Sequence, residues 1–420
     1  MCVLHMADIK TALQDFNPWW KGTFTIEYKP RELYAQLQKY LPLPQIIALT
    51  GLRRVGKTTL LHKFIKDYLE RGVSPTNILY FSFDEFREIE LRKVLQITSE
   101  LTRVDFISAE GIIFFDEIQK VGRWEEQLKS LYDLTGKRVK IFISGSESLF
   151  LKKKLKETLA GRIFEFKVDP LSFKEFLCFK GLSFEPPALY EPELRQLFWE
   201  YTLTQGFPEL ISITDKEIIK KYIQESIIDK IIYKDIPALF KVKDGSVLSS
   251  LLNIFMYQPG QIIEISHLAK EIGLSRDTVS KYLTYLENSF LLRKLYNFSQ
   301  SRRKVERKLK KYYPTVLAID LLFKDDDLSR SLIFEWLVVT QQRAEFFWRD
   351  SYKHEVDMII ANGTIVPIEI KYGKVDLKGI IFFMDKYKLE HGKIITSYQQ
   401  EEKEINGKKI TLIPAHIYFL

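Results

Sequence analysis

The nine residues from 51 to 59 constrain this chain more than any other stretch. They read GLRRVGKTT and fit the pattern G-x-x-x-x-G-K-[ST], which is typical of a loop that wraps around phosphate groups. An apolar run at 46–50 precedes the loop, and a helical pattern begins at Thr59. Glycines let the loop turn its N–H groups inward, and the helix N-terminus adds partial positive charge. The sequence therefore predicts a strand, a phosphate-binding loop and a helix.

The chemistry of this loop assigns roles to its residues. We expect Lys57 to reach the β- and γ-phosphates of ATP and Thr58 to ligate Mg²⁺, so ATP and Mg²⁺ are the predicted cofactors. The predicted nucleotide-binding residues of the loop are Gly51, Arg53, Arg54, Gly56, Lys57, Thr58 and Thr59.

A second stretch, the apolar run at 112–115, ends in two carboxylates, Asp116 and Glu117. We expect Asp116 to bind the nucleotide through Mg²⁺, which it would hold by way of water. We expect Glu117 to orient and polarise the attacking water as a catalytic residue. The pair indicates hydrolysis of ATP rather than binding alone.

Five apolar runs alternate with helical patterns, at 46–50, 78–83, 112–115, 139–144 and 163–168. This alternation predicts an α/β fold with a parallel, doubly wound sheet, which we assign to an ATPase core at 31–170. Residues 1–30 lack clear periodicity. Trp19, Trp20 and Phe24 indicate that they form an N-terminal arm packed on the core.

The bulk composition fits a globular protein. The 420 residues are 46% hydrophobic and 28% charged, which suggests two to four domains. No stretch approaches the ~18–20 apolar residues of a membrane helix, and the first residues do not resemble a signal peptide, so we expect no membrane partner. The two cysteines, Cys2 and Cys178, exclude a disulfide framework and favour the cytoplasm. A net charge of +8 permits nucleic-acid binding without establishing it.

Two residues of the core have roles that spacing leaves open. Ser144 ends a predicted strand beside the phosphate loop, where its hydroxyl would sense the γ-phosphate or place the water. Alternatively, this is a plain turn in which Ser146 caps a helix. Arg162 precedes the fifth strand and would reach a neighbouring subunit's nucleotide as an arginine finger, or else form a surface salt bridge.

Five stretches occur together in one order: GLRRVGKT at 51–58, FDEIQ at 115–119, SGS at 144–146, LAGR at 159–162 and PLSFKEF at 170–176. With GFPE at 206–209 and KDI at 234–236, the chain resembles the prokaryotic and archaeal AAA+-type ATPases that carry a C-terminal restriction-endonuclease-like domain. The resemblance covers nearly the whole chain. It implies catalytic roles for Ser144 and Arg162, a helical lid at 171–243, and a homo-oligomer formed through the arginine finger.

Residues 263–287 read as a helix, a turn at Gly273 and a second helix capped by Ser275. This pattern is typical of a helix-turn-helix, with 291–298 as the wing of a winged helix at 244–300. The residues predicted to face DNA are Arg276, Thr278 and Lys281. Alternatively, the winged helix is a rigid spacer or a regulatory contact.

The run from 301 to 311 is rich in arginine and lysine. Beside a helix-turn-helix it predicts a track for DNA phosphates, whereas the alternative is a solvated hinge. The DNA-binding residues predicted there are Arg302, Arg303 and Lys304.

Residues 301–420 carry a second acidic constellation. Asp357 is followed about a dozen residues later by Glu369 and Lys371 in an E-x-K pattern, which resembles metal-dependent nucleases of the restriction-endonuclease class. The resemblance implies that Asp357, Glu369 and Glu335 bind Mg²⁺ and that Lys371 orients the water or steadies the phosphate charge as a catalytic residue. Alternatively, the fold keeps its acids for structure and does not cleave.

The hairpin loop between the last two strands of this constellation decides whether the metal site forms. A two-residue loop would place Asp357 across from Ile368, on the face away from Glu369. A three-residue loop pairs Ile360 with Thr364 and places the two carboxylates on one face. We predict the three-residue loop, or another odd-numbered one, with the carboxylates close enough to share a cation.

Taken together, these patterns predict an α/β multidomain protein of AAA+ type that hydrolyses ATP and acts on DNA, with a Mg²⁺-dependent nuclease domain if the C-terminal acids are catalytic. The alternative is a nucleotide-dependent signalling switch whose C-terminal domain binds a partner or DNA without cleaving it.

Overall fold

A computed structural model describes residues 6–86, 89–146, 158–242, 244–301, 303, 305 and 309–420. The chain divides into two compact units, residues 1–169 and 170–420. This division lies beside the predicted end of the ATPase core at residue 170, and each unit is described by itself below. No helix within the described ranges is long and apolar enough to cross a membrane.

The first unit contains a five-stranded sheet in which every pair of neighbouring strands is parallel, as predicted. Its strands are β1 (Ile46–Thr50), β2 (Ile78–Ser82), β3 (Gly111–Asp116), β4 (Val139–Gly145) and β5 (Ile163–Lys167). Their order is β2-β3-β4-β1-β5. Strands β1 and β3 are buried along their whole length, because helices cover both faces of a parallel sheet and near-continuous apolar runs suit that position.

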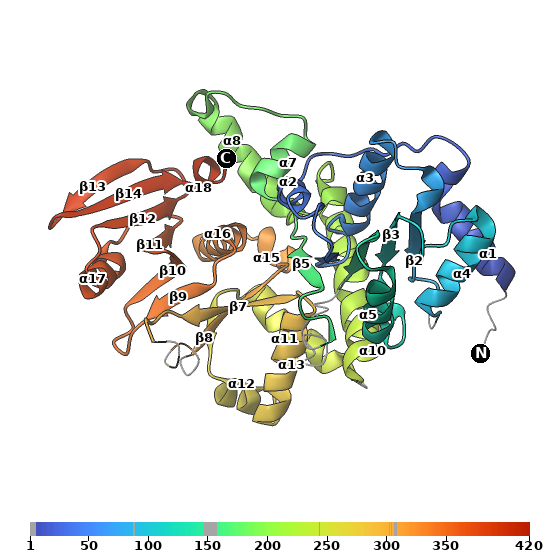
Figure 1. Ribbon diagram of the computed structural model, residues 1–420. Coiled ribbons are helices and arrows are strands. Elements are labelled where there is room, and N and C mark those ends of the chain that lie inside the picture. The colour runs from blue at the N-terminus through green and yellow to red at the C-terminus, as the bar shows by residue number, and fades with distance from the viewer. Residues whose placement is uncertain are drawn as a thin grey trace. The chain divides into compact units, whose positions relative to one another are not determined.

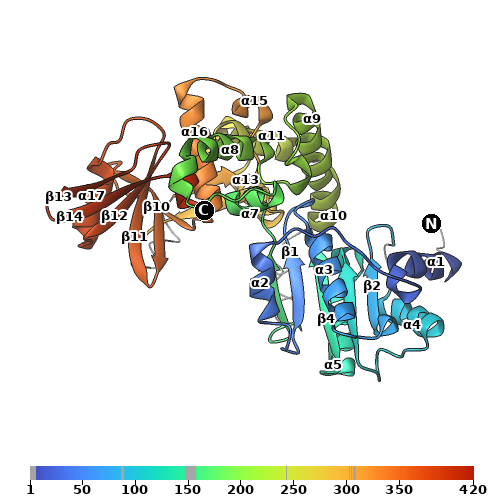
Figure 2. The ribbon, with the colours of Figure 1, turned by 90° about the horizontal axis from the view of Figure 1, so that it is seen from above.

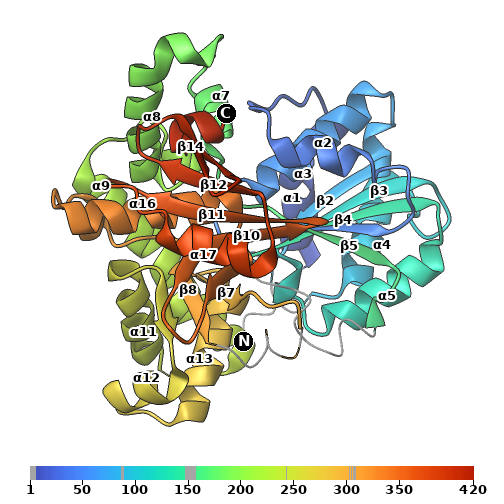
Figure 3. The ribbon, with the colours of Figure 1, turned by 90° about the vertical axis from the view of Figure 1, so that its left-hand side faces the viewer.

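Helices pack on both faces of this sheet. Figure 3 shows α2 (Glu32–Gln38) and α3 (Lys57–Glu70) on one face and α4 (Leu91–Thr102) and α5 (Trp124–Thr135) on the other. On the α3 face, stacked rings of Tyr34, Phe64, Phe142 and Phe114 follow one another with centroids 4.6–5.2 Å apart. This column ties α2 and α3 to the central strands through aromatic stacking.

Within the arm, where the sequence shows no clear periodicity, residues 6–16 form a helix, α1 (Met6–Phe16). Its buried residues Ile9, Ala12 and Leu13 lie three and four positions apart and pack into the core of the unit. The arm packs on the core as predicted, since Trp19 is 2% exposed and its ring lies against Phe24.

The arm also closes the outer edge of β2, which is an outer strand of the sheet. The indole N–H groups of Trp19 and Trp20 donate to the Ile78 carbonyl at 3.1 and 2.9 Å. The fully buried Asn17 side chain pairs with both backbone groups of Tyr80: it accepts from the amide at 2.7 Å and donates to the carbonyl at 2.8 Å. These side chains satisfy edge groups that would otherwise be open to another strand.

We expect Asn17→Ala to lower the free energy of unfolding by about 2–3 kcal/mol, because it leaves buried backbone groups of β2 without partners. Urea unfolding of the full chain measures the effect. The matched control is Gln14→Ala, an exposed position on α1, which should change stability by less than ~0.5 kcal/mol. Equal effects of the two substitutions would contradict this role of Asn17.

The second unit begins with helices, as predicted for 171–243. They are α7 (Phe173–Phe179), α8 (Glu191–Thr204), α9 (Lys216–Lys221) and α10 (Ile236–Phe240). Two π-helical stretches, Tyr222–Ile228 and Ile231–Asp235, join α9 to α10, and Figure 2 shows the result as one long helix. After α11 (Ser246–Tyr257) come α12 (Ile265–Glu271) and α13 (Arg276–Asn288).

A nine-stranded mixed sheet forms the rest of this unit, in the order β13-β14-β12-β11-β10-β9-β7-β8-β6. The strands are β6 (Gln261–Ile263), β7 (Leu292–Asn297), β8 (Lys310–Pro314), β9 (Phe346–Arg349), β10 (Glu355–Asn362), β11 (Thr364–Lys371), β12 (His391–Thr396), β13 (Glu401–Ile405) and β14 (Lys408–Pro414). Figure 1 shows α16 (Asp327–Gln342) and α17 (Lys378–Tyr387) on opposite faces of β10–β12. The short helices α15 (Ile319–Leu322) and α18 (Ala415–Tyr418) complete the unit.

The strand predicted as a wing, β7, belongs to this large sheet. It pairs with β8 and also with β9, through Tyr296–Phe346 and Asn297–Phe347. The sheet therefore continues across the predicted domain boundary at 300/301. The two preceding helices and their turn lie where the sequence predicts them, with Gly273 in the left-handed region at φ +69° and Ser275 capping α13.

The register of the β10–β11 hairpin differs from the predicted pairing but confirms that the loop has an odd number of residues. Asn362 pairs with Thr364, so Gly363 alone forms the tip, and Ile360 pairs with Val366. The predicted pairing of Ile360 with Thr364 is wrong, because the ladder continues up to Gly363, which takes φ +84° without strain. The shift of two residues preserves every side chain's face.

Candidate functional site

The loop at 51–56 leads from β1 into α3 with the strand–loop–helix geometry that its sequence predicts. A Cβ on Gly51 would lie 2.2 Å from the backbone oxygen of Val168, so only glycine fits there. Gly56 has φ +94°, in the left-handed region. Arg31, which sequence reasoning did not single out, donates to the carbonyls of Val55 at 2.8 Å and Asp169 at 2.7 Å and so braces the loop.

Lys57 lies inside the loop. It is 5% exposed, and its Nζ donates to the carbonyls of Gly51 at 3.1 Å and Leu52 at 2.8 Å. The ammonium thus sits at the centre of the loop, where a phosphate chain held by the loop amides would meet it. This is the position that the motif predicts for Lys57.

The carboxylate of Asp116, at the end of β3, is the hub of the site. It is 3% exposed and accepts from Thr58 Oγ1 at 2.7 Å, from the Tyr80 hydroxyl at 2.8 Å and from the Ser144 hydroxyl. Burial and the charge of Asp116 raise the pKa of Tyr80 well above its ordinary value, so this hydroxyl keeps its proton and donates. The structure therefore brings together the predicted residues Thr58, Asp116 and Ser144, and adds Tyr80.

Glu117 adopts φ +55°, a left-handed conformation that costs a non-glycine residue about 1–2 kcal/mol. Its amide donates to Ser144 Oγ at 3.2 Å, and its Oε2 accepts from Gln119 Nε2 at 2.6 Å and Ser146 Oγ at 3.3 Å. The carboxylate is thus held in one orientation beside Asp116. Gln119 and Ser146 were not predicted to act here, and only the FDEIQ and SGS stretches pointed to them.

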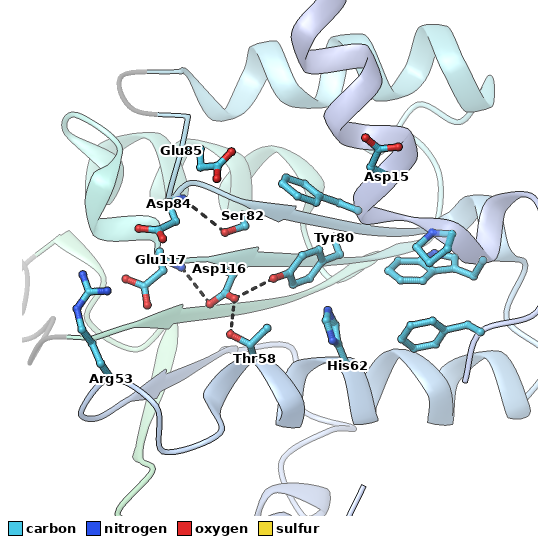
Figure 4. Close-up of a pocket in the computed structure, with 14 residues that line it drawn as sticks. Asp15, Arg53, Thr58, His62, Tyr80, Ser82, Asp84, Glu85, Asp116 and Glu117 are labelled. Atoms are coloured by element: carbon cyan, nitrogen blue, oxygen red, sulfur yellow. Dashed lines mark hydrogen bonds between the residues drawn. The ribbon is translucent and has the colours of Figure 1, made fainter. Parts of the chain in front are cut away.

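A cavity of about 540 Å³ opens over this hub. Arg53, Thr58, Asp116 and Glu117 line one part of it, and Figure 4 shows Thr58 and Tyr80 converging on Asp116. The N-terminal arm supplies further lining through Trp19 and other residues of 15–24. The hydroxyl of Thr58, the guanidinium of Arg53 and the carboxylates of Asp116 and Glu117 thus surround one space, which suits a phosphate chain and its metal ion.

Three predicted residues stand apart from this hub. Arg54 and Thr59 are exposed. Arg162 lies at the start of β5, where its carbonyl accepts from the Ile46 amide, so it is at the opposite end of the strands from the loop. Its guanidinium forms a bidentate ion pair with Asp133 at 2.9 and 3.3 Å. This is the surface salt bridge that the sequence analysis gave as the alternative role of Arg162. Its role as an arginine finger stays a prediction.

Comparison with known families places this site. The family model described as "AAA domain" matches residues 43–177, which include the loop, Asp116, Glu117 and Ser144. Residues 43–177 form an AAA-type P-loop ATPase domain. This AAA domain is a nucleotide-binding domain of the ATPase class, with the parallel sheet described above. Two domains of unknown function match later stretches of the chain, DUF8612 at 195–315 and DUF4143 at 331–418.

Similar whole proteins are themselves uncharacterized. One from Haemophilus influenzae is 33% identical over 63% of this chain and 66% of its own length, so just under two thirds of that protein is matched. One from Methanocaldococcus jannaschii is 29% identical over 78% of this chain and 75% of its own length. A solved structure, AMPPCP-bound DnaA from Aquifex aeolicus, is 16% identical, with 63% of this chain and 89% of that chain covered and a TM-score of 0.29.

In the second unit, the predicted nuclease residues do gather in one cluster. The register of the hairpin puts Asp357 and Glu369 on the same face of the sheet, and Lys371 Nζ donates to Glu369 Oε1 at 2.7 Å. Burial, and then the charge of Glu335, raises the pKa of Asp357 to about 6. Burial, and then the charge of Asp357, raises the pKa of Glu369 to about 8. These shared effects agree with carboxylates that lie close together, as predicted.

The cluster differs from the prediction in holding a buried lysine. Lys311, from the basic run, is 4% exposed and lies among Glu335, Glu355 and Asp357. Neither the predicted DNA phosphate track nor the alternative of a solvated hinge therefore holds for Lys311, because its strand turns this side chain inward. Within the described ranges, no group of three or more histidine, cysteine or acidic side chains is arranged to hold a metal ion.

The predicted DNA contacts have different surroundings. Arg276 and Lys281 are exposed on α13, whereas the Thr278 hydroxyl lies 2.8 Å from Ser275 Oγ in the helix cap. Arg303 is exposed. Arg302 and Lys304 lie outside the described residues.

We expect Lys57→Ala to abolish ATP binding and Glu117→Gln to retain it. Glu117→Gln should lower the rate of ATP hydrolysis on the order of 10²-fold, because the amide cannot accept a proton from water. Nucleotide binding by fluorescence and phosphate release measure the two steps separately. Glu110→Gln, at an exposed position before β3, serves as the control and should change neither. Loss of ATP binding in Glu117→Gln would contradict these roles.

Proposed function

We propose that this protein hydrolyses ATP with Mg²⁺, and that its nucleotide state controls how the second unit binds DNA without cutting it. The observation that carries hydrolysis is the fixed Glu117 carboxylate beside the Asp116 hub. A protein that only bound ATP would not require a carboxylate held in a strained conformation by Gln119 and Ser146. We also propose a cytoplasmic location, on the basis of the two cysteines.

The residues of the site divide the work of hydrolysis. The oxygens of Thr58 and Asp116 lie 2.7 Å apart and would hold Mg²⁺, which supplies charge compensation for the phosphates. Lys57 binds and steadies the β- and γ-phosphates. Glu117 accepts a proton from the attacking water, and Gln119 fixes its orientation. The Ser144 hydroxyl, bonded to Asp116 and to the Glu117 amide, couples the two carboxylates and would report the state of the γ-phosphate.

The proposal of DNA as the partner rests on α13 and on charge. Arg276 and Lys281 are exposed near the start of a helix that follows a helix-and-turn, an arrangement that places such residues in the major groove in known DNA-binding proteins. The net charge of +8 favours a polyanionic partner. A signalling switch that binds another protein is the alternative.

Cleavage of DNA is the second candidate function, and the gathering of Asp357, Glu369 and Lys371 favours it. However, the oxygens of Asp357 are already engaged: Oδ2 accepts from the Ile370 amide at 2.9 Å, and Oδ1 faces Lys311 at 3.5 Å. We therefore propose binding without cleavage.

The test is fluorescence anisotropy of the full chain with duplex DNA at several salt concentrations, with ATP or ADP. We expect the two nucleotides to give different affinities, and Lys57→Ala to abolish that difference. Replacing both Arg276 and Lys281 by Ala should weaken binding to all sequences and lower the salt slope by about 0.9 for each lost phosphate contact. Lys409→Ala, half-exposed on β14, is the control.

In the same samples with Mg²⁺, the DNA should remain intact. Nicking that disappears in Asp357→Ala would replace this proposal by the nuclease function. An unchanged salt slope in the Arg276 and Lys281 variant would exclude α13 as the DNA-binding element.

A further inference from the structure

The cluster in the second unit is organised around the ammonium of Lys311. Its Nζ lies 2.8 Å from Glu335 Oε1 on α16, 2.8 Å from Glu355 Oε1 on β10 and 3.5 Å from Asp357 Oδ1 on β10. Three carboxylates from two elements thus converge on one point, and that point holds a nitrogen cation. Burial alone would lower the pKa of Lys311, but the surrounding carboxylates raise it well above its ordinary value, so the side chain carries its charge.

Lys311 reaches this point from a distant strand. In the sheet order, β7 and β9 separate β8 from β10, and three steps of ~4.8 Å would place β8 about 14 Å from β10 in a flat sheet. The side chains of Lys311 and of the acids on β10 span this backbone separation, since their tips lie 2.8–3.5 Å apart. Tyr313, two residues along β8 on the same face, donates to Glu335 Oε1 at 2.6 Å, so two side chains of β8 contact this carboxylate.

A β-bulge presents Asp357 to the cluster. The pairing of β10 with β9 shifts register between Val356 and Ile359, and Asp357 lies within that shift. A bulge re-aims a side chain, and here the Asp357 carboxylate accepts from the Ile370 amide of β11 at 2.9 Å. Asp357 is therefore built into the backbone hydrogen bonding of the sheet.

The oxygens that a metal ion would use are mostly committed to these contacts. Glu335 Oε1 faces both Lys311 and Tyr313, both oxygens of Asp357 are engaged, and Glu369 Oε1 accepts from Lys371. Among the described residues, Glu369 Oε2 is buried without a partner. Mg²⁺ and Ca²⁺ bind carboxylate oxygens together with water, so a metal ion here would have to displace the ammonium of Lys311 to reach these carboxylates. Space is also restricted, since a Cβ on Gly260 would lie 3.0 Å from Glu335 Oε1.

We infer that Lys311 is a built-in cation, which occupies the point where these carboxylates converge and excludes a divalent metal from the second unit. The metal that a restriction-endonuclease-like domain would need does not fit beside it. Charge explains the arrangement, because three cationic side chains face four acidic ones. The cations are Lys311, Lys371 and Arg349, and the acids are Glu335, Glu355, Asp357 and Glu369. Arg349 Nη1 lies 3.3 Å from Glu355 Oε2. This inference does not depend on ATP hydrolysis or on DNA binding.

A consequence follows for a chain without this lysine. Lys311→Ala removes the ammonium and leaves four acidic side chains facing two cations around the vacated volume. Oxygen-rich sites with excess negative charge bind divalent cations. The substitution should therefore create a metal site that the natural chain does not have.

The experiment counts bound Mn²⁺ by electron paramagnetic resonance in the full-length, nucleotide-free protein. We expect Lys311→Ala to bind one more Mn²⁺ per chain than the wild type, and the further substitution Asp357→Asn to remove that gain. Lys294→Ala is the matched control, since it breaks a lysine–glutamate pair at 2.7 Å between β7 and α13, outside the cluster, and it should bind as many ions as the wild type. Thermal unfolding of Lys311→Ala should rise with Mn²⁺, whereas that of Lys294→Ala should not.

Two results would overturn the inference. One is Mn²⁺ binding by the wild type that Asp357→Asn weakens, since the metal would then displace or accompany the lysine. The other is a folded Lys311→Ala protein that gains no ion. If Lys311→Ala does not fold, Lys311→Met, which keeps much of the aliphatic stem, takes its place. The comparison of wild type with Asp357→Asn tests the inference in either case.

Discussion

The buried carboxylate of Asp116 is the interaction on which the nucleotide site depends. A carboxylate removed from water must be compensated by hydrogen bonds, and Asp116 obtains them from Thr58, Tyr80 and Ser144, which lie on α3, β2 and β4. This arrangement requires β3 to lie between β2 and β4, as the strand order has it. The order of the sheet and the chemistry of the site are thus one constraint, because another neighbour for β3 would leave the carboxylate without its donors.

Local sequence was sufficient to predict the frame of this site. The glycine pattern at 51–56 is recognisable because the backbone needs residues without a Cβ, and Gly51 confirms this through its closeness to Val168. The five strands were predictable because each is a short apolar run between turns. The contributions of Tyr80 and Asn17 were not, because they are side-chain hydrogen bonds between elements, and one sequence does not show which element lies beside which.

In the second unit, the sequence predicted the faces of one hairpin but not the orientation of strand β8. The odd number of residues expected in the β10–β11 loop placed Asp357 and Glu369 on one face, since only an odd loop separates polar from apolar residues in that hairpin. The role of Lys311 was hidden because Lys310, Lys311, Tyr312 and Tyr313 give each face of β8 one lysine and one tyrosine. Neither orientation is favoured by such a pattern. The direction is set instead by the carboxylates of α16 and β10, which lie far from β8 in the sequence.

The outer strands of the ATPase sheet limit how copies of the chain can associate. On β2, the arm covers the backbone groups of Ile78 and Tyr80 with Trp19, Trp20 and Asn17. On β5, the other outer strand, Glu165 and Lys167 are exposed charged residues. Both edges are thus protected against pairing with a foreign strand. A sheet continued from one molecule into the next is therefore disfavoured on either side, and any ring or stack of these domains would have to be held together by side chains.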